Sequence, residues 1–210
     1  MFFDLPPVQP SAEVVIASDY VRDGVSLTNG ETVYQGAVRL DMGKVYVKAG
    51  VAAGDFALGA DTEAQLAIGA RTDFAGFQVD ASATYTNYRG VIAGVDNEEV
   101  DYRVTASREV GPINAAVSYQ YNPDAFGGVG KEHLVDTRVT LPVKFAGAQL
   151  NGGVGRVWSD AGDYTIWNAG VTKNFAERYA VDARYFDSNA EERFGTAYGD
   201  RFVVSLRASF

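Results

Sequence analysis

Three stretches of this sequence repeat one short pattern: an apolar residue, Asp, a variable residue and Arg. They begin at Val100, Val135 and Val181, and they contain the pairs Asp101 and Arg103, Asp136 and Arg138, and Asp182 and Arg184. A carboxylate two residues from a guanidinium group is suited to binding a ligand, to proton transfer, or to mutual neutralisation inside a folded wall. The elements that carry the pairs decide among these uses.

Few other residues are candidates for catalysis or metal binding. His133 is the only histidine, and the absence of cysteine excludes a thiolate metal site and a cysteine nucleophile. Asp136 lies three residues beyond His133 and therefore faces the opposite side of a strand, which argues against a hydrolase that pairs the two. We expect His133 to be a structural or rim residue, and we expect no enzyme activity, no cofactor and no metal centre.

Glycine-rich and acidic stretches also invite comparison with ligand-binding loops. Segment 125–133 has Glu132 where a phosphate-binding loop requires Ser or Thr after its lysine. Three acidic stretches do not follow calcium-loop spacing, and they are residues 95–101, 159–163 and 187–192. We expect exposed loops and a solvated acidic rim, with divalent ions that bridge this rim to lipopolysaccharide as the alternative.

The composition favours strands over helices. The 210 residues include 23 Gly, 12 Phe and 12 Tyr but only 6 Pro, a balance typical of strands and turns. The net charge of −9, without any basic run, excludes nucleic acid as a partner. No apolar run approaches the roughly 20 residues that a membrane-spanning helix needs.

Apolar residues recur at every second position in twelve segments, which is the signature of β-strands. The segments are residues 12–20, 33–40, 44–52, 63–71, 77–85, 100–107, 113–121, 135–143, 148–158, 164–173, 179–186 and 200–210. The tight links are 41–44, 73–76, 109–112, 144–147 and 174–178, and the longer polar links lie around 22–31, 54–62, 87–98, 122–133, 159–163 and 187–198. Tight turns that alternate with long loops, around an even number of strands, predict an all-β, antiparallel, up-and-down transmembrane barrel.

This reading divides the chain into a periplasmic N-terminal tail, residues 1–10, and a 12-stranded β-barrel, residues 11–210. The short turns face the periplasm, and the longer loops face the cell exterior. The last strand ends at Phe210 with apolar residues at alternate positions, as in the C-terminal signal that barrel assembly machinery recognises. We therefore expect a monomer in the bacterial outer membrane, with membrane lipids, lipopolysaccharide and that machinery as its partners.

The same alternation assigns a face to each charged residue. Val100 and Tyr102 face lipid, so Asp101 and Arg103 face the lumen. The residues predicted to line the pore in this way are Asp80, Asp101, Arg103, Asp136, Arg138, Asp182, Arg184, Arg201, Arg207, Arg71, Lys48 and Arg39, with Glu13, Asp19 and Glu63 beside them. Acids and bases are nearly balanced in this set, so we expect mutual neutralisation and weak ion selectivity.

Aromatic residues gather near both ends of the predicted strands, where they mark the two membrane interfaces. Phe74, Phe77, Phe145, Phe175, Tyr179 and Phe210 lie near one end, and Tyr20, Tyr34, Tyr102, Tyr121, Trp158 and Tyr164 lie near the other. We expect both groups to face the lipid.

One segment resembles a known family. Ser18-Asp19-Tyr20, Gly24, Ser26 and Gln35-Gly36 match the opening of a proteobacterial family of outer-membrane barrels called TorF or Gcw_chp, whose usual pattern is S-D-Y-x-F-R-G-x-S followed by Q-G. The chain departs from this pattern with Val21-Arg22-Asp23 before Gly24. The specific match is confined to residues 18–36, and the rest agrees in size and strand rhythm. The resemblance implies an outer-membrane barrel and carries no activity with it.

Barrel geometry limits what such a lumen can do. Twelve strands about 4.8 Å apart, tilted near 40°, give a backbone diameter of roughly 24 Å, and side chains take up much of that width. The function that we predict is a small, weakly selective passive pore for ions or small polar solutes. The alternatives are a structural or interaction barrel with an occluded lumen and, less favoured, a membrane-embedded hydrolase.

Overall fold

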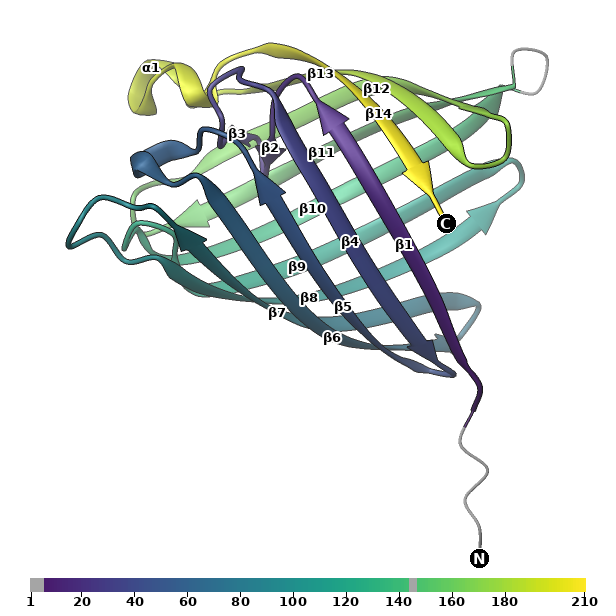
Figure 1. The fold of residues 1–210 in the computed structure, drawn as a ribbon. Helices are drawn as coiled ribbons and strands as arrows, with labels where there is room; N and C mark the ends of the chain where they lie inside the picture. Colours follow the sequence, from purple (N-terminus) through teal and green to yellow (C-terminus); the bar gives the residue numbers. More distant parts are fainter. Residues whose placement is uncertain (1–5, 144–146) are drawn as a thin grey trace, which may run out of the picture.

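Twelve antiparallel strands form one closed barrel in the computed structural model of the protein (Figure 1). The structure describes residues 6–143 and 147–210. The barrel strands are β1 (Val8–Ala17), β4 (Val33–Met42), β5 (Val45–Ala53), β6 (Thr62–Phe74), β7 (Phe77–Arg89), β8 (Glu98–Val110), β9 (Ile113–Ala125), β10 (Gly130–Val143), β11 (Ala148–Ser159), β12 (Tyr164–Phe175), β13 (Tyr179–Ser188) and β14 (Arg201–Ser209). Each pairs with its neighbours around the barrel, and β1 pairs with β14 to close it. The predicted fold is confirmed.

The links between strands alternate in length from β1 to β9, as predicted. In the turn between β6 and β7, Ala75 and Gly76 have φ of 51° and 79°, which suits a two-residue connection between twisted antiparallel strands. The link predicted at 122–133 shortens to residues 126–129, because β9 and β10 extend beyond the regular apolar alternation.

The loop end also carries three short helices, η1 (Ala57–Gly59), α1 (Glu191–Phe194) and η3 (Thr196–Tyr198). None of the helices in the described residues has the length and apolar character needed to cross a bilayer.

The outer face of the barrel is apolar and the inner face is polar, which is the reverse of a soluble protein. On β14, outward Phe202 is 65% exposed, whereas inward Val203 is 8% exposed. Exposed apolar side chains recur in this way on every barrel strand. The arrangement is stable where lipid tails, rather than water, cover the outer face.

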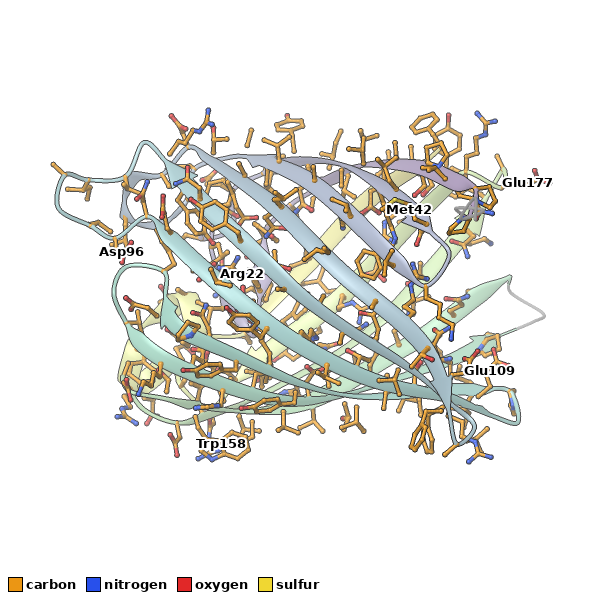
Figure 2. All side chains as sticks on the ribbon, turned by 90° about the horizontal axis from the view of Figure 1, so that it is seen from below. Arg22, Met42, Asp96, Glu109, Trp158 and Glu177 are labelled. Carbon is orange, nitrogen blue, oxygen red and sulfur yellow. The ribbon has the colours of Figure 1, made fainter. Side chains whose placement is uncertain are left out.

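The aromatic girdles need two corrections. Trp158 lies on the outside of the barrel, towards the end that carries Asp96 (Figure 2). Tyr164, however, is buried inside against Leu134 and Val157, and Tyr20 also turns inward. The reason is that Tyr164 lies on the inward-facing set of β12, and Tyr20 lies beyond the end of β1. Phe145 lies outside the described residues.

The connection between β1 and β4 folds back into the barrel. It contains β2 (Val21–Arg22) and β3 (Val25–Ser26), which pair with each other around Asp23 and Gly24. The labels of both strands lie within the barrel outline, near its loop end (Figure 1). We name residues 18–30 the inner hairpin. The sequence predicted only a long loop here, because two-residue strands leave no periodic signal.

Buried apolar side chains fill part of the loop end of the barrel. One cluster contains Val33, Phe56 and Tyr88, and a second contains Leu134 and Tyr164. The apolar core therefore lies inside the extracellular half, around the inner hairpin, and the rest of the lumen is left to polar groups.

The first strand begins earlier than the sequence predicted. β1 starts at Val8 rather than at residue 12, so residues 8–10 of the predicted tail already pair with β4. Pro10 falls within this segment, and the β1 pairing with β14 runs from Glu13, which leaves Pro10 without a partner on that side. A proline is tolerated at such an edge because it has no N–H to donate.

Candidate functional site

The structure places the twelve predicted pore-lining residues on the inner face of the barrel. Within the described residues, all but Arg138 form hydrogen bonds or ion pairs with other inward side chains. Arg138 instead lines a cavity within the lumen.

The periplasmic half of the lumen contains a neutralised network on β4 to β7. The Arg39 guanidinium lies 3.5 Å from the centre of the Tyr46 ring and donates to Asp41 at 2.9 Å. Arg71 donates to the same carboxylate at 2.5 Å and lies 3.6 Å from Asp80. Tyr46 donates its hydroxyl proton to Asp80 at 2.9 Å. These charges compensate one another while remaining in reach of water.

The three Asp-x-Arg pairs behave differently from one another. Arg184 donates to Asp182 at 3.0 and 3.1 Å, so this pair closes on itself. Arg103, in contrast, reaches across β9 to Asp136 of the second pair. Asp101 accepts hydrogen bonds from amide side chains on β9. The repeat thus determines which face is charged, whereas the tertiary structure determines which charges meet.

Arg22 attaches the inner hairpin to three strands of the wall. It donates to Glu99 at 2.5 Å, to Glu63 at 3.2 Å and to the Tyr88 hydroxyl at 2.5 Å. Glu63 and Glu99 are 2% and 5% exposed, and a buried carboxylate needs a partner because desolvation costs several kcal/mol. Figure 2 shows Arg22 between the barrel walls, nearer the end that carries Asp96.

The base of the inner hairpin is attached to β14. Asp19 is buried and accepts hydrogen bonds from Arg201 at 2.9 Å, Ser26 at 2.6 Å and Thr28 at 2.8 Å. Burial raises the pKa of Asp19, but these hydrogen bonds outweigh it and leave the pKa below its usual value. Asp19 is therefore ionised at neutral pH and holds Arg201.

The tip of the inner hairpin reaches the opposite wall. Asp23 accepts a hydrogen bond from Gln120 of β9 at 2.9 Å. Gly24 has φ of 80°, and a Cβ there would lie 2.2 Å from a methyl carbon of Ile166 on β12. Only glycine combines this conformation with so close an approach. The hairpin therefore crosses the lumen.

Two cavities meet at the hairpin tip, and Arg22 and Asp23 line both. The cavity on the extracellular side has a volume of about 240 Å³ and includes Glu99, Asp101, Gln120, Glu132, Tyr164 and Tyr198 in its lining. The deeper cavity has a volume of about 250 Å³ and includes Arg103, Leu134, Asp136, Arg138, Ile166 and Asn168. The tip is the partition between the mouth of the barrel and its middle.

Comparison with known protein families shows to which family the chain belongs. A family model described as "Bacterial protein of unknown function (Gcw_chp)" matches residues 5–210. The chain belongs to this family. The match confirms the resemblance inferred from residues 18–36 and extends it over almost the whole chain. No curated protein sequence matches this Gcw_chp protein.

Solved structures share its fold. The "KdgM porin in complex with disordered oligogalacturonate" has a TM-score of 0.67 and 7% identity, and the alignment covers 95% of this chain and 99% of that one. The NanC porin has a TM-score of 0.58 and 10% identity, covering 96% and 98%. The COG4313 outer membrane channel from Pseudomonas putida F1 has a TM-score of 0.58 and 15% identity, covering 97% and 95%. The Gcw_chp chain thus has the architecture of small porins, and its location is the bacterial outer membrane.

The residues that carried the Gcw_chp resemblance lie mostly in the inner hairpin. Asp19 and Ser26 form its base, and Gly24 forms its tip. Sequence reasoning missed Arg22, which departs from the family pattern, and Glu99 on the wall. Strand parity places Glu99 on the same face as Asp101 and was sufficient to find it, whereas no local pattern signals a loop that folds inward.

His133 lies outside the lumen, on the lipid-facing side of β10. Its Nδ1 is 2.8 Å from the Tyr119 hydroxyl, and its ring stacks on Tyr121 with centroids 4.8 Å apart. Asp136 points the opposite way, into the lumen, so the two do not form a catalytic pair. Within the described residues, no group of three His, Cys, Asp or Glu side chains is arranged to hold a metal ion.

Proposed function

We propose that this Gcw_chp protein is a passive outer-membrane pore for ions and small polar solutes, narrowed by the inner hairpin. The observation that carries the proposal is the pair of cavities that meet at Arg22 and Asp23. The hairpin tip lies between the extracellular mouth and the middle of the lumen. A charged interior is costly in a membrane unless water or a polar solute occupies it, so the lined spaces favour a wet path.

The ion pairs of the lumen favour weak selectivity. A strongly selective pore carries a ring of one sign, whereas Arg39, Arg71, Arg103 and Arg184 each have a carboxylate partner. The porins named above support the proposal through their fold alone, because one fold serves many functions. The oligogalacturonate belongs to the KdgM structure, and we do not transfer it to this chain.

Planar-bilayer recording of the refolded barrel tests the proposal. We expect stable conductance steps that are smaller than those of an unobstructed barrel roughly 24 Å across. The same recordings with a salt gradient give the reversal potential, which we expect to lie near zero.

An occluded structural barrel is the second candidate. It is favoured by the attachment of the inner hairpin to several barrel strands, through hydrogen bonds of Asp19, Arg22 and Asp23. The barrel is shown to be folded by its heat-sensitive gel mobility and strand content. If such a folded barrel gives no conductance steps, the result supports the occluded barrel and contradicts the pore. Silence that persists after the Arg22 attachment is removed strengthens that conclusion.

We also propose the remaining parts of the cellular setting. Phe210 is exposed on the outer face at the end of the chain, in line with recognition of the last strand by barrel assembly machinery. The outer face meets membrane lipids and lipopolysaccharide, the barrel is a monomer, and the residues before β1 form a periplasmic tail. Chemical cross-linking in outer-membrane vesicles tests the monomer.

A further inference from the structure

We propose that the deeper cavity binds small zwitterionic solutes, with Asp23 receiving the cationic group and Arg138 the carboxylate. This inference rests on the pore proposed above and deepens it by assigning a solute class to one position along the path. The cavity lies just inside the inner hairpin, where a solute that has passed the tip first reaches the middle of the lumen.

Most charges that line this cavity are already neutralised by the protein. Arg22 is held by Glu63 and Glu99, neither of which lines the cavity. Arg103 is paired with Asp136. These groups give the cavity polar edges, but a ligand gains little by competing with a partner already in place.

Asp23 and Arg138 are the exceptions. Neither forms an ion pair within residues 6–143 and 147–210, and no ion pair joins them to each other. Asp23 accepts one hydrogen bond, from Gln120 through Oδ2. One cavity therefore presents an acid and a base that form no ion pair in the described residues, on two different elements: the hairpin tip and β10.

The remainder of the cavity suits a small aliphatic body. Leu134, Ile166 and Phe186 supply apolar surface. Gly155 lets the Leu134 and Ile166 side chains pack close against the wall, because a Cβ there would lie 3.1 Å from both. A zwitterion with an aliphatic side chain matches all three features: acid, base and apolar wall.

The volume of the cavity limits the class of solute further. The cavity measures about 250 Å³, below the range of about 300–1,000 Å³ that is typical for drug-sized ligands. A solute the size of an amino acid fits, whereas an oligomer does not fit within it as a whole. A singly charged solute of the same size leaves either Asp23 or Arg138 without a partner, so it binds more weakly.

Saturation-transfer NMR of the detergent-solubilised barrel tests the site with three probes of the same shape. L-valine carries both charges, isovalerate lacks the amine, and isobutylamine lacks the carboxylate. We expect valine to bind about tenfold more tightly than either, since each lacks one charge-assisted contact. Arg138→Gln should weaken valine and isovalerate about tenfold and leave isobutylamine unchanged. Asp23→Asn should weaken valine and isobutylamine and leave isovalerate unchanged.

Both substitutions are mild for folding, because neither residue has an ion pair to lose and Asn keeps an oxygen for Gln120. Arg156→Gln is the matched control: Arg156 pairs with Asp163 at 3.6 Å on the rim, outside the cavity, and valine affinity should not change. Equal affinity for the three probes, or valine binding that ignores both cavity substitutions, overturns the inference. Valine binding without conductance contradicts the pore but leaves the site standing. Conductance without valine binding overturns the binding site but leaves the pore standing.

Discussion

Replacement of Arg22 by Gln tests whether the inner hairpin controls the width of the lumen. The Arg22 guanidinium contacts Glu63, Tyr88 and Glu99 on three adjacent strands. Gln cannot supply the charge, so two buried carboxylates lose their ion-pair partner. The strand pairing of the barrel does not depend on Arg22. We therefore expect the hairpin to leave its site while the barrel stays folded.

The size of the effect follows from burial. Removal of one partner from a fully buried ion pair costs about 3–5 kcal/mol. Here the two carboxylates are buried but the Arg22 side chain is 23% exposed, and water in the lumen screens part of the loss. We expect about 2–3 kcal/mol against hairpin docking. At 1.4 kcal/mol per factor of ten, the undocked population rises about 30- to 150-fold.

Single-channel recording measures this population as the fraction of time spent in a larger conductance state. Arg207→Gln is the matched control, because the Arg207 side chain is 54% exposed, lies 3.9 Å from Glu13 and does not contact the inner hairpin in the described residues, so its loss should leave the fraction of time in the larger conductance state unchanged. Combining Arg22→Gln with Glu63→Gln and Glu99→Gln should restore much of the docking, since no charge is then left buried alone. Equal open fractions in the wild type and Arg22→Gln would refute the reasoning.

Four further substitutions have defined outcomes. Gly24→Ala should raise the open fraction, at a cost to docking of about 1–3 kcal/mol, because its Cβ would meet Ile166 at 2.2 Å; adding Ile166→Ala should recover part of the loss. The pKa of Asp19 lies below its usual 3.8, so its contribution to docking is complete above that pH and is lost as the pH falls below it. Asp19→Asn should raise the open fraction at neutral pH and flatten the change seen on acidification. Thr86 Oγ1 is buried without a hydrogen-bond partner in the described residues, so Thr86→Val should stabilise the barrel by up to about 1 kcal/mol in urea unfolding. His133→Ala should leave conductance unchanged, whereas loss of a lipase or protease activity on this substitution would contradict the expectation that the protein has no enzyme activity.

Strand positions and faces were predictable because their signal is local. Phe202 and Arg201 are adjacent, and alternation alone places one against lipid and the other in the lumen. The same rule predicted the inner face for Asp101, Arg103, Asp136 and Arg138. It also contains the information for Tyr164, which shares a face of β12 with Asn168 and Thr172 and is thereby assigned to the inside. The prediction that Tyr164 belongs to the lipid-facing girdle was wrong, because it rested on the position of Tyr164 along its strand and not on the side of the strand that Tyr164 occupies.

The pairing of the charges was not predictable from the same pattern. Asp-x-Arg suggests that neighbours on one strand neutralise each other, and this holds for Asp182 and Arg184. Arg103 instead meets Asp136 of β10, although β9 lies between their two strands. Which charges, such as Arg138, have no ion-pair partner in the described part of the chain follows only from the completed barrel.

The sequence by itself determined twelve strands, their alternating turns and loops, and the side of the wall that each residue occupies, because each depends on residues two positions apart. The tertiary structure alone decided that residues 18–30 fold inward, that Arg22 meets Glu99 across 77 positions of sequence, and that Asp23 and Arg138 share one cavity. These contacts join the loop to strands on the other side of the lumen. The alternation of residues along one strand carries no information about which loop residues will meet which strand residues once the barrel has closed.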